Sequence, residues 1–389
     1  MASIEMIGVT KRYESTVAID DLSLRVEDNE FFVLFGPAGA GKSTTLKCIA
    51  GVEFPQKGLV KIGGTIVNLI EPSNRNVSMV FENYALYPHM SVYDNIASPL
   101  RSRLHRKSEP DIKKAIDKIA TLMHIESLYD RKPNQLSNGQ RQRVAIGRCL
   151  VREPNVFLMD EPLAHLDAKL KHTMRAELKE MQDAFNTTTI YVTHDYLEAM
   201  SLADRIAVLD HGRVVQLGTA LQMYYTPGNE FVAKLFGEPE INLIDAQFYV
   251  EGGKTLISTG IGLTYEAEPD VAAALQTQEH NRLHLGIRGN NVAFSFQGGG
   301  EGWLRGTVFA NEPIGNSVIM TVQLGPEQIR VVAPNDTNAA LDQTVYVRLA
   351  TANVLYFGAD TRRYIVRHNQ EQVSSVAHLR RAGREGGEA

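Results

Sequence analysis

The chain has 389 residues, of which 43% are hydrophobic and 22% charged, and its formal net charge is −5. This length predicts two or more domains, and the composition is that of an ordinary globular protein. The slightly acidic balance argues against a general electrostatic nucleic-acid binder. No stretch reaches the ~20 uninterrupted apolar residues needed to cross a bilayer, so any membrane role is expected to go through a partner.

The N-terminus lacks the charged region and apolar core of a secretion signal. Cys48 and Cys149 lie far apart in helix-like segments, which fits small buried positions in a reducing compartment rather than a disulfide framework. Residues 4–8 and 17–26 are predicted strands. Tyr13 lies between them and could stack on a purine, although a single tyrosine there is more often plain packing.

A glycine-rich stretch, Gly36–Ser43, follows the apolar run 31–35 and opens a helix-like segment that ends near Gly51. The spacing G-x-x-x-x-G-K-S between a strand and a helix is typical of a phosphate-binding loop, in which backbone N–H groups surround the anion. Lys42 supplies positive charge for the β- and γ-phosphates, and the Ser43 hydroxyl suits Mg²⁺. The alternative, a glycine turn before a surface lysine, is disfavoured by this context. The predicted phosphate-binding residues are Gly36, Pro37, Ala38, Gly39, Ala40, Gly41, Lys42, Ser43 and Thr44.

The next segments combine a buried strand with an aromatic loop. A hairpin is predicted over 58–68 around Gly63-Gly64, and the apolar run 77–81 should bring Glu82 to a strand end, where ligands meet a parallel sheet. The aromatic, proline-broken stretch 83–90 is either a docking surface or a packed loop. Residues 92–105 and 110–124 are predicted helices.

A polar loop at Ser137, Asn138, Gly139 and Gln140 runs into an apolar-periodic helix. Ser137 is a credible N-cap, and the free N–H groups of this helix end, together with the hydroxyl, make an anion site without a lysine. A well-capped helix with no further role explains the same residues, and on local evidence alone it is the better explanation.

Two later strands end in side chains that folding does not require. Asp160 and Glu161 follow the apolar run 156–159, where two adjacent carboxylates would repel each other. With an upstream phosphate-binding loop, Asp160 is predicted to lie on the Mg²⁺ side and Glu161 to polarise the attacking water. The β-rich run 189–193 ends at His194, which could donate a hydrogen bond to a γ-phosphate.

After Gly237 the pattern changes to short strands with Gly, Asn and Pro turns, which predicts an all-β module of the barrel or sandwich kind. The predicted domains are 1–236, with a helical insert over about 88–150, and 237–389. A polar tail is expected from about residue 368, with a disordered end. The predicted strands are 242–250, 254–258, 283–287, 304–310, 317–323, 328–332, 344–349 and 362–367.

Taken in order, these motifs resemble the ATPase subunit of ATP-binding cassette transporters, and most closely the sugar- and polyol-importing branch of the maltose-importer type. The resemblance covers essentially the whole chain. Residues 136–140 are similar to the signature loop, 159–162 to the second nucleotide motif, 166–167 to the D-loop, and His194 to the switch histidine. The C-terminal module is similar to the family's OB-like regulatory domain at 285–288 and 313–316.

The resemblance implies an α/β P-loop nucleotide-binding domain with a helical insert, followed by an all-β, OB-like regulatory domain. It implies ATP and Mg²⁺ as cofactors, with Ser43, Glu82 and Asp160 around the metal, Tyr13 on the adenine and Asp167 in the D-loop. Two ATPase subunits would face head to tail, so that Ser137 to Gln140 of one close the site of the other.

The same resemblance implies partners and a location. Residues 83–100 would contact two membrane-spanning permease subunits, a solute-binding protein would act indirectly, and no nucleic acid is expected. The chain would sit peripherally on the cytoplasmic side of the inner membrane and energise import of a solute, a sugar or polyol by branch.

Three positions depart from the family's pattern: Glu82 replaces glutamine, Asn138 replaces the first signature glycine, and His165 replaces the usual D-loop asparagine, while Ala38 and Ala40 are milder changes. They leave two arrangements open, a homodimer with tolerated changes or a pair with a second, non-identical ATPase. The alternative function is a nucleotide-binding coupling subunit with impaired hydrolysis in such a pair. A soluble cassette protein of repair or translation is disfavoured by 83–100 and the β-module.

Overall fold

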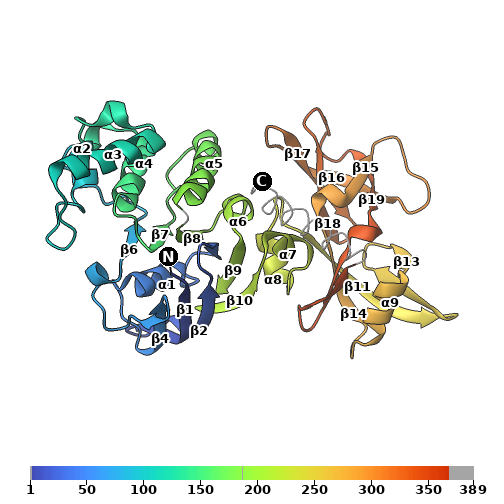
Figure 1. The fold of residues 1–389 in the computed structure, drawn as a ribbon. Helices are drawn as coiled ribbons and strands as arrows, with labels where there is room; N and C mark the ends of the chain where they lie inside the picture. Colours follow the sequence, from blue (N-terminus) through green and yellow to red (C-terminus); the bar gives the residue numbers. More distant parts are fainter. Residues whose placement is uncertain (1, 186, 368–389) are drawn as a thin grey trace, which may run out of the picture. The chain divides into compact units, whose positions relative to one another are not determined.

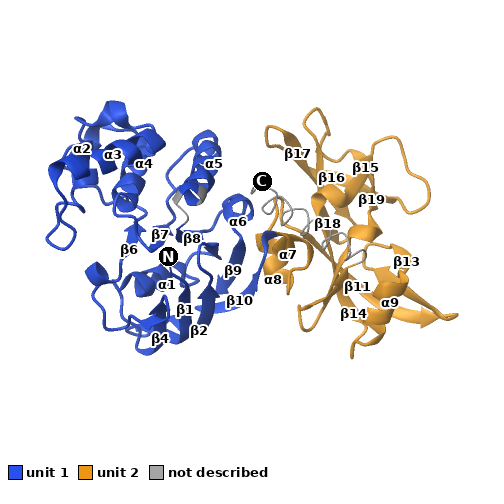
Figure 2. Cartoon of the chain, in the orientation of Figure 1, with its two compact units in different colours: residues 1–220 blue, residues 221–389 orange. Residues whose placement is uncertain are grey.

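The computed structural model describes residues 2–185 and 187–367, and the chain divides into two compact units, 1–220 and 221–389 (Figures 1 and 2). The polar tail expected from about residue 368 lies outside the described residues. The short helix α7 (Ala220–Tyr225) begins at this division, and the short helix α8 (Glu230–Leu235) follows it. The domain border between 236 and 237 stays a prediction from the change in sequence pattern.

The central element of unit 1 is a six-stranded sheet in the order β10-β9-β3-β8-β7-β6. Its strands are parallel except β10, which pairs antiparallel with β9. Strands β3, β7 and β8 are buried along their whole length, as expected for parallel strands covered on both faces. The strands are β3 (Phe31–Phe35), β6 (Val77–Val80), β7 (Val156–Asp160), β8 (Thr188–Thr193), β9 (Arg205–Asp210) and β10 (Arg213–Gly218).

A second sheet of unit 1 is antiparallel, in the order β2-β1-β4-β5. Its apolar face shares one core with β3 and helix α1, including Ile4, Val26, Leu34 and Ile49, which are fully buried. The hairpin predicted at Gly63-Gly64 is confirmed as β4–β5. The strands are β1 (Ile4–Tyr13), β2 (Thr16–Val26), β4 (Lys57–Ile62) and β5 (Thr65–Ile66).

The helices of unit 1 lie on the central sheet or in the insert formed by α2, α3 and α4 (Figure 1). The helix predicted over 92–105 is wrong beyond Ala97, because Pro99 follows and has no backbone N–H to continue the hydrogen-bond ladder of the helix. The helix predicted over 110–124 is confirmed to within one residue. The helices are α1 (Lys42–Ala50), α2 (Val92–Ala97), α3 (Glu109–Met123), α4 (Asn138–Leu150), α5 (Ala168–Phe185) and α6 (Tyr196–Leu202).

Unit 2 consists mainly of two antiparallel sheets, ordered β13-β12-β11-β14-β20-β21 and β15-β19-β16-β17-β18. Their inner faces share one apolar core that includes Ile244, Leu285, Val322 and Val347. This confirms the predicted all-β module. The strands are β11 (Asn242–Glu251), β12 (Lys254–Thr259), β13 (Thr264–Glu266), β14 (Arg282–Ile287), β15 (Val292–Ser295), β16 (Leu304–Pro313), β17 (Ser317–Leu324), β18 (Glu327–Pro334), β19 (Thr344–Leu349), β20 (Leu355–Gly358) and β21 (Tyr364–Arg367).

Helices α7 and α8 were not predicted, and among the strands and α-helices after Gly237 neither were β13, β15, β20 and helix α9 (Pro269–Gln276). The strands have only three or four residues, too few for alternation to be visible, and α9 begins at a proline that serves as a helix start. Within residues 2–185 and 187–367, none of the helices has the length and apolar character required to pass through a membrane.

Candidate nucleotide-binding site

The turn between β3 and α1 can be made only with glycine at two positions. Gly36 has φ 152° and Gly41 φ 97°, and a Cβ at either residue would lie 2.3 Å from a backbone oxygen, that of Leu209 or Ala18 respectively. Ala38 and Gly39 are exposed at the tip of the turn, while Ala40 is buried. The free N–H groups at the start of α1 are therefore oriented as a phosphate site requires.

Lys42 lies inside this turn. Its Nζ donates to the carbonyls of Gly36 and Pro37, both at 2.9 Å, and lies 3.8 Å from Glu161 Oε1. Burial lowers the pKa of Lys42, and the charges of Glu161 and Asp160 oppose that shift. The ammonium group is thus a buried cation next to the position predicted for the terminal phosphates.

Asp160, the last residue of β7, accepts a hydrogen bond from the Ser43 hydroxyl at 2.8 Å. Burial raises the pKa of Asp160, as do the nearby charges of Glu161 and Glu82, while Ser43 and Lys47 oppose the rise. These two oxygens suit Mg²⁺, which prefers oxygen ligands. Among the described residues, no group of three or more acidic, His or Cys side chains is placed to hold a metal ion.

Glu161 is held from two sides. It follows β7 with φ 45°, and its N–H donates to the carbonyl of Val192 in the neighbouring β8. Its Oε2 lies 2.9 Å from His194 Nδ1, and its Oε1 faces Lys42. The Glu161 side chain is 20% exposed and that of His194 is 60% exposed. The carboxyl ends of three parallel strands thus bring a cation, a carboxylate and an imidazole to one edge of the sheet.

Two further predicted residues reach this edge from other elements. Glu82 lies exposed in the turn after β6, close enough for its charge to act on Asp160. Tyr13 ends β1 and is 39% exposed. Burial raises the pKa of Tyr13, whereas a hydrogen bond with Thr44 in the first turn of α1 opposes the shift. A tyrosine ring therefore lies beside the phosphate-binding turn.

Hydrogen bonds between residues of the signature-like loop hold its start in place, and in the described part of the chain the loop does not bond to the phosphate-binding turn. Ser137 caps α4, and it forms reciprocal hydrogen bonds with Gln140 at 3.3 and 3.0 Å. Gly139 is buried, and a Cβ there would lie 2.6 Å from Leu170 Cδ2. Among the described residues, no hydrogen bond or ion pair joins 137–140 to 36–44 within the chain.

The remaining predicted residue, Asp167, accepts a hydrogen bond from the N–H of Leu170 at 2.9 Å and so supports the first turn of α5. Sequence reasoning missed Lys47, whose charge acts on Asp160. Lys47 lies four residues after Ser43, on the same face of α1, so helical spacing could have revealed it.

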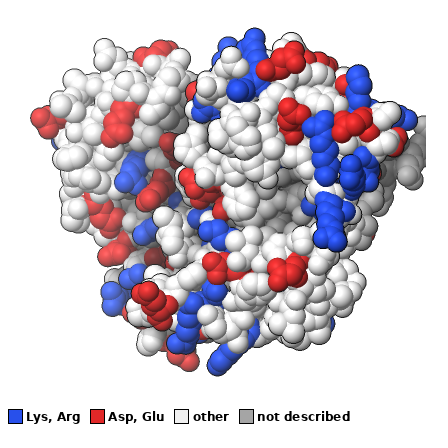
Figure 3. Space-filling view, turned by 90° about the vertical axis from the view of Figure 1, so that its left-hand side faces the viewer, with Lys and Arg blue, Asp and Glu red and all other residues white. Residues whose placement is uncertain are grey.

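Two hollows are lined in part by residues of the segment 83–90. One, of about 420 Å³, is lined by residues that include Met79, Tyr87, Leu104 and Arg148. The other, of about 280 Å³, includes Asn83, Tyr84, Leu86 and Arg141. Figure 3 shows the face of unit 1 that carries the helical insert, where acidic and basic side chains are interspersed and the surface is hollowed near its centre.

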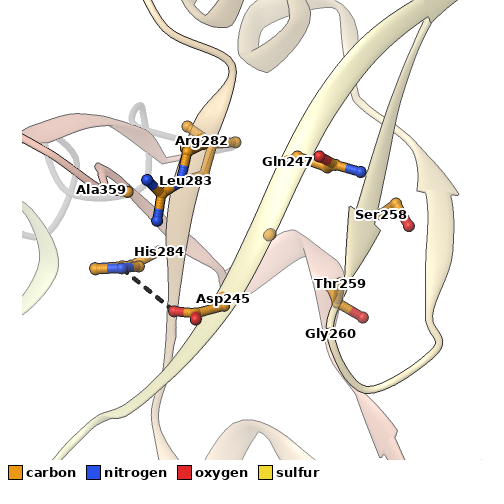
Figure 4. A pocket seen from close by; sticks show the side chains of 10 residues that line it. Asp245, Gln247, Ser258, Thr259, Gly260, Arg282, Leu283, His284 and Ala359 are labelled. Carbon is orange, nitrogen blue, oxygen red and sulfur yellow. Dashed lines mark ion pairs between the residues drawn. The ribbon is translucent and has the colours of Figure 1, made fainter.

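Unit 2 has a hollow of its own, of about 310 Å³, on strands β11, β12 and β14 (Figure 4). His284 lies in it between two carboxylates, 2.6 Å from Glu230 Oε1 and 3.3 Å from Asp245 Oδ1. Gln247 and Arg282 line the same hollow. None of the predicted nucleotide-site residues contributes to it.

Comparison with known proteins identifies both units. The family model described as ABC transporter matches residues 19–164, and the model described as TOBE domain matches residues 285–357. The chain is similar to a solved dimeric ATP-binding cassette in a post-hydrolysis state bound to ADP and Pi. That similarity has a TM-score of 0.52 at 30% identity and covers 56% of this chain and 98% of that one.

Three relatives are import ATP-binding proteins. The sn-glycerol-3-phosphate import ATP-binding protein of Rhodopseudomonas palustris (strain BisB5) is 40% identical over 94% of this chain and 100% of its own length. The protein of that name from Rhizobium meliloti is 45% identical, covering 81% and 90%. The xylose/arabinose import ATP-binding protein of Haloferax volcanii is 45% identical, covering 75% and 74%.

Proposed function

This chain belongs to the ATP-binding cassette transporter family and is an ATP hydrolase, and we propose that it energises import of a sugar, a polyol or a phosphorylated polyol. The observation that carries the proposal is the arrangement of Lys42, Glu161 and His194 at one sheet edge, in a chain whose relatives are import ATP-binding proteins. The domains are proposed as 1–236 for ATP and 237–389 for regulation.

The proposed hydrolysis site positions phosphates and balances their charge, which is most of what phosphoryl transfer requires. Gly36 to Thr44 surround the phosphates, and Lys42 faces the β- and γ-phosphates. Ser43, Asp160 and Glu82 would hold Mg²⁺, which offsets phosphate charge when bound. Tyr13 stacks on the adenine.

Glu161 orients the attacking water and accepts its proton at a carboxylate oxygen. His194 fixes the Glu161 side chain through its Nδ1. When both ring nitrogens carry a proton, the other nitrogen can also donate to the γ-phosphate. The intact pair supports a hydrolysing subunit over the impaired coupling subunit.

A second ATPase subunit completes the site. The capped start of α4, with Ser137, Asn138, Gly139 and Gln140, offers N–H groups to an anion but has no lysine of its own. In a head-to-tail dimer it would cover ATP on the partner's phosphate-binding loop, with Asp167 nearby. The partner is a second copy or a non-identical chain.

The membrane partners are proposed to be two permease subunits that contact residues 83–100. The two hollows lined in part by 83–90 and the exposed Tyr87 offer concave surface to such a partner. The chain would lie peripherally on the cytoplasmic side of the inner membrane, and a solute-binding protein would deliver solute to the permease from the other side.

The test is to purify the chain with its membrane subunits, place the complex in vesicles and measure ATP-driven uptake of labelled glycerol 3-phosphate, glycerol, xylose and maltose. We expect uptake of one of them with the native chain and none with Glu161→Gln. Robust ATP hydrolysis by a chain that copurifies with no membrane subunit would contradict the transport role.

A further inference from the structure

The loop after β6 contains two consecutive left-handed residues that are not glycine, Tyr84 with φ 63° and Ala85 with φ 44°. Such backbone is unfavourable for L-residues and persists where the surroundings hold it. Arg148, in the last turn of α4, donates to the carbonyl of Tyr84 at 3.0 Å and to that of Ala85 at 2.7 Å. One guanidinium thus fixes both residues of the bend.

The bend turns the Tyr84 side chain inward. The residue is only 7% exposed, in a segment whose neighbours Asn83 and Ala85 are exposed. Its ring meets the ring of His165 edge-on, with centroids 6.5 Å apart and an angle of 73° between the planes. The Tyr84 hydroxyl has no hydrogen-bond partner among the described residues, so the contact with His165 depends on the ring alone.

His165 lies in the turn that begins at the predicted catalytic base. The N–H of Ala164 donates to the carbonyl of Glu161 at 3.2 Å, and the carbonyl of His165 accepts from Asn138 Nδ2 at 3.5 Å. The contacts therefore form a continuous series that begins and ends on α4. It runs from the start of α4 through His165 and Tyr84 and returns to α4 at Arg148. Two of the residues that depart from the family pattern, Asn138 and His165, contact each other in it.

We propose that Tyr84 and His165 are positioning residues that couple the permease-facing segment 83–90 to the turn 161–167, with Arg148 fixing the bend that makes this possible. The inference rests on the proposed contact of 83–100 with the permease. A permease that displaces 83–90 would move the Tyr84 ring, and this ring packs on the histidine that continues the Glu161 turn. The pair would thus set how strongly the permease stimulates hydrolysis.

The test compares ATP hydrolysis by the full-length chain alone and in complex with its membrane subunits, for Tyr84→Leu, His165→Ala and the double variant. We expect kcat of the isolated chain to stay within about twofold, since neither residue contacts the reacting groups, and stimulation by the membrane subunits to fall by about fivefold, a typical coupling effect. The double variant should lose no more than either single variant, because both remove the same contact.

Two matched controls separate coupling from structure. Tyr84→Phe keeps the ring and should be stimulated like the native chain, and so should His172→Ala, which removes an exposed histidine of α5. Because His165 is exposed, His165→Ala tests the contact without opening the core. Unchanged stimulation in His165→Ala, an equal loss of kcat in the isolated chain, or losses that multiply in the double variant would each overturn the proposal. A native chain that its membrane subunits do not stimulate would overturn the transport function as well.

Discussion

Among single residues, Glu161 has the most defined surroundings, since Lys42, His194 and the carbonyl of Val192 all fix it. Glu161→Gln keeps an acceptor for His194 but removes the negative charge and the proposed base. We expect kcat for ATP hydrolysis to fall by ~10²–10⁴-fold, the range for loss of general-base catalysis, while ATP binding is retained. Phosphate release measures kcat, and an equilibrium binding experiment measures ATP binding.

Glu109→Gln is the control for Glu161→Gln, because Glu109 forms an exposed ion pair with Arg101 in the helical insert. It should hydrolyse ATP at the native rate. If Glu161→Gln kept native turnover, this chain's own site would not contribute to hydrolysis, and the coupling-subunit alternative would regain support.

The shifted pKa of Asp160 predicts that the stability of the folded chain depends on pH. Burial raises its pKa, so the folded chain binds this proton more tightly than the unfolded chain does. Stability therefore falls as pH rises from the ordinary aspartate pKa to the raised one, and the penalty is complete above both. Without nucleotide, Asp160→Asn should melt at a higher temperature than the native chain at pH 7.5, and the difference should shrink as the pH is lowered.

The pKa of Asp117 is shifted in the opposite direction to that of Asp160, because the hydrogen bond from Lys113 lowers it. Asp117→Asn should not raise the melting temperature at pH 7.5. If Asp160 holds Mg²⁺ as proposed, Asp160→Asn should also lose the stabilisation that Mg²⁺ and ATP are expected to give the native chain. A lower melting temperature for Asp160→Asn at pH 7.5 without nucleotide would show that the carboxylate stabilises the fold.

Among the elements, α4 begins at a residue, Ser137, that is either a helix cap alone or part of an anion-binding site. Aspartate caps a helix about as well as serine, so Ser137→Asp should preserve the fold. It also places a negative charge where the partner's phosphates are expected. We expect hydrolysis to fall by about a hundredfold, the size of a lost oxyanion contact, with an unchanged melting temperature. Ser108→Asp, at the cap of α3, removes a hydroxyl that donates to Asp111 and adds a second carboxylate there, so it should lower stability but preserve hydrolysis. If the two variants hydrolyse ATP alike, Ser137 is only a cap.

For the whole molecule, the prediction concerns composite sites. In the proposed site, a chain with Lys42→Ala would lack its phosphate cation, and a chain with Ser137→Asp would not close its partner's site. In a head-to-tail dimer of identical chains, the mixed dimer contains one site without either defect. Each variant alone should hydrolyse little ATP, and an equimolar mixture, after exchange of subunits, should regain measurable activity. No recovery would favour a non-identical ATPase partner.

The fold class followed from the sequence because the strongest patterns are local. The buried runs 31–35, 156–159 and 189–193 became parallel strands, and the alternating segments after Gly237 became antiparallel sheets. The elements that were wrong or missing were short or interrupted. Helix α2 stops before Pro99. Strands β15 and β20 acquire their strand conformation from pairing with distant strands, and β13 is a three-residue strand that pairs with its hairpin partner β12.

The sequence alone determined the phosphate-binding turn and the carboxylates, because glycines at 36 and 41 and a carboxylate pair after an apolar run are local features. Only the tertiary structure decided which side chains meet. The strand order β9-β3-β8-β7-β6 brings Lys42, Glu161 and His194 together although more than a hundred residues separate the first two. Likewise, the left-handed bend at Tyr84 and its contact with His165 depend on Arg148 from another element. The sequence pattern around Tyr84 does not predict such a contact.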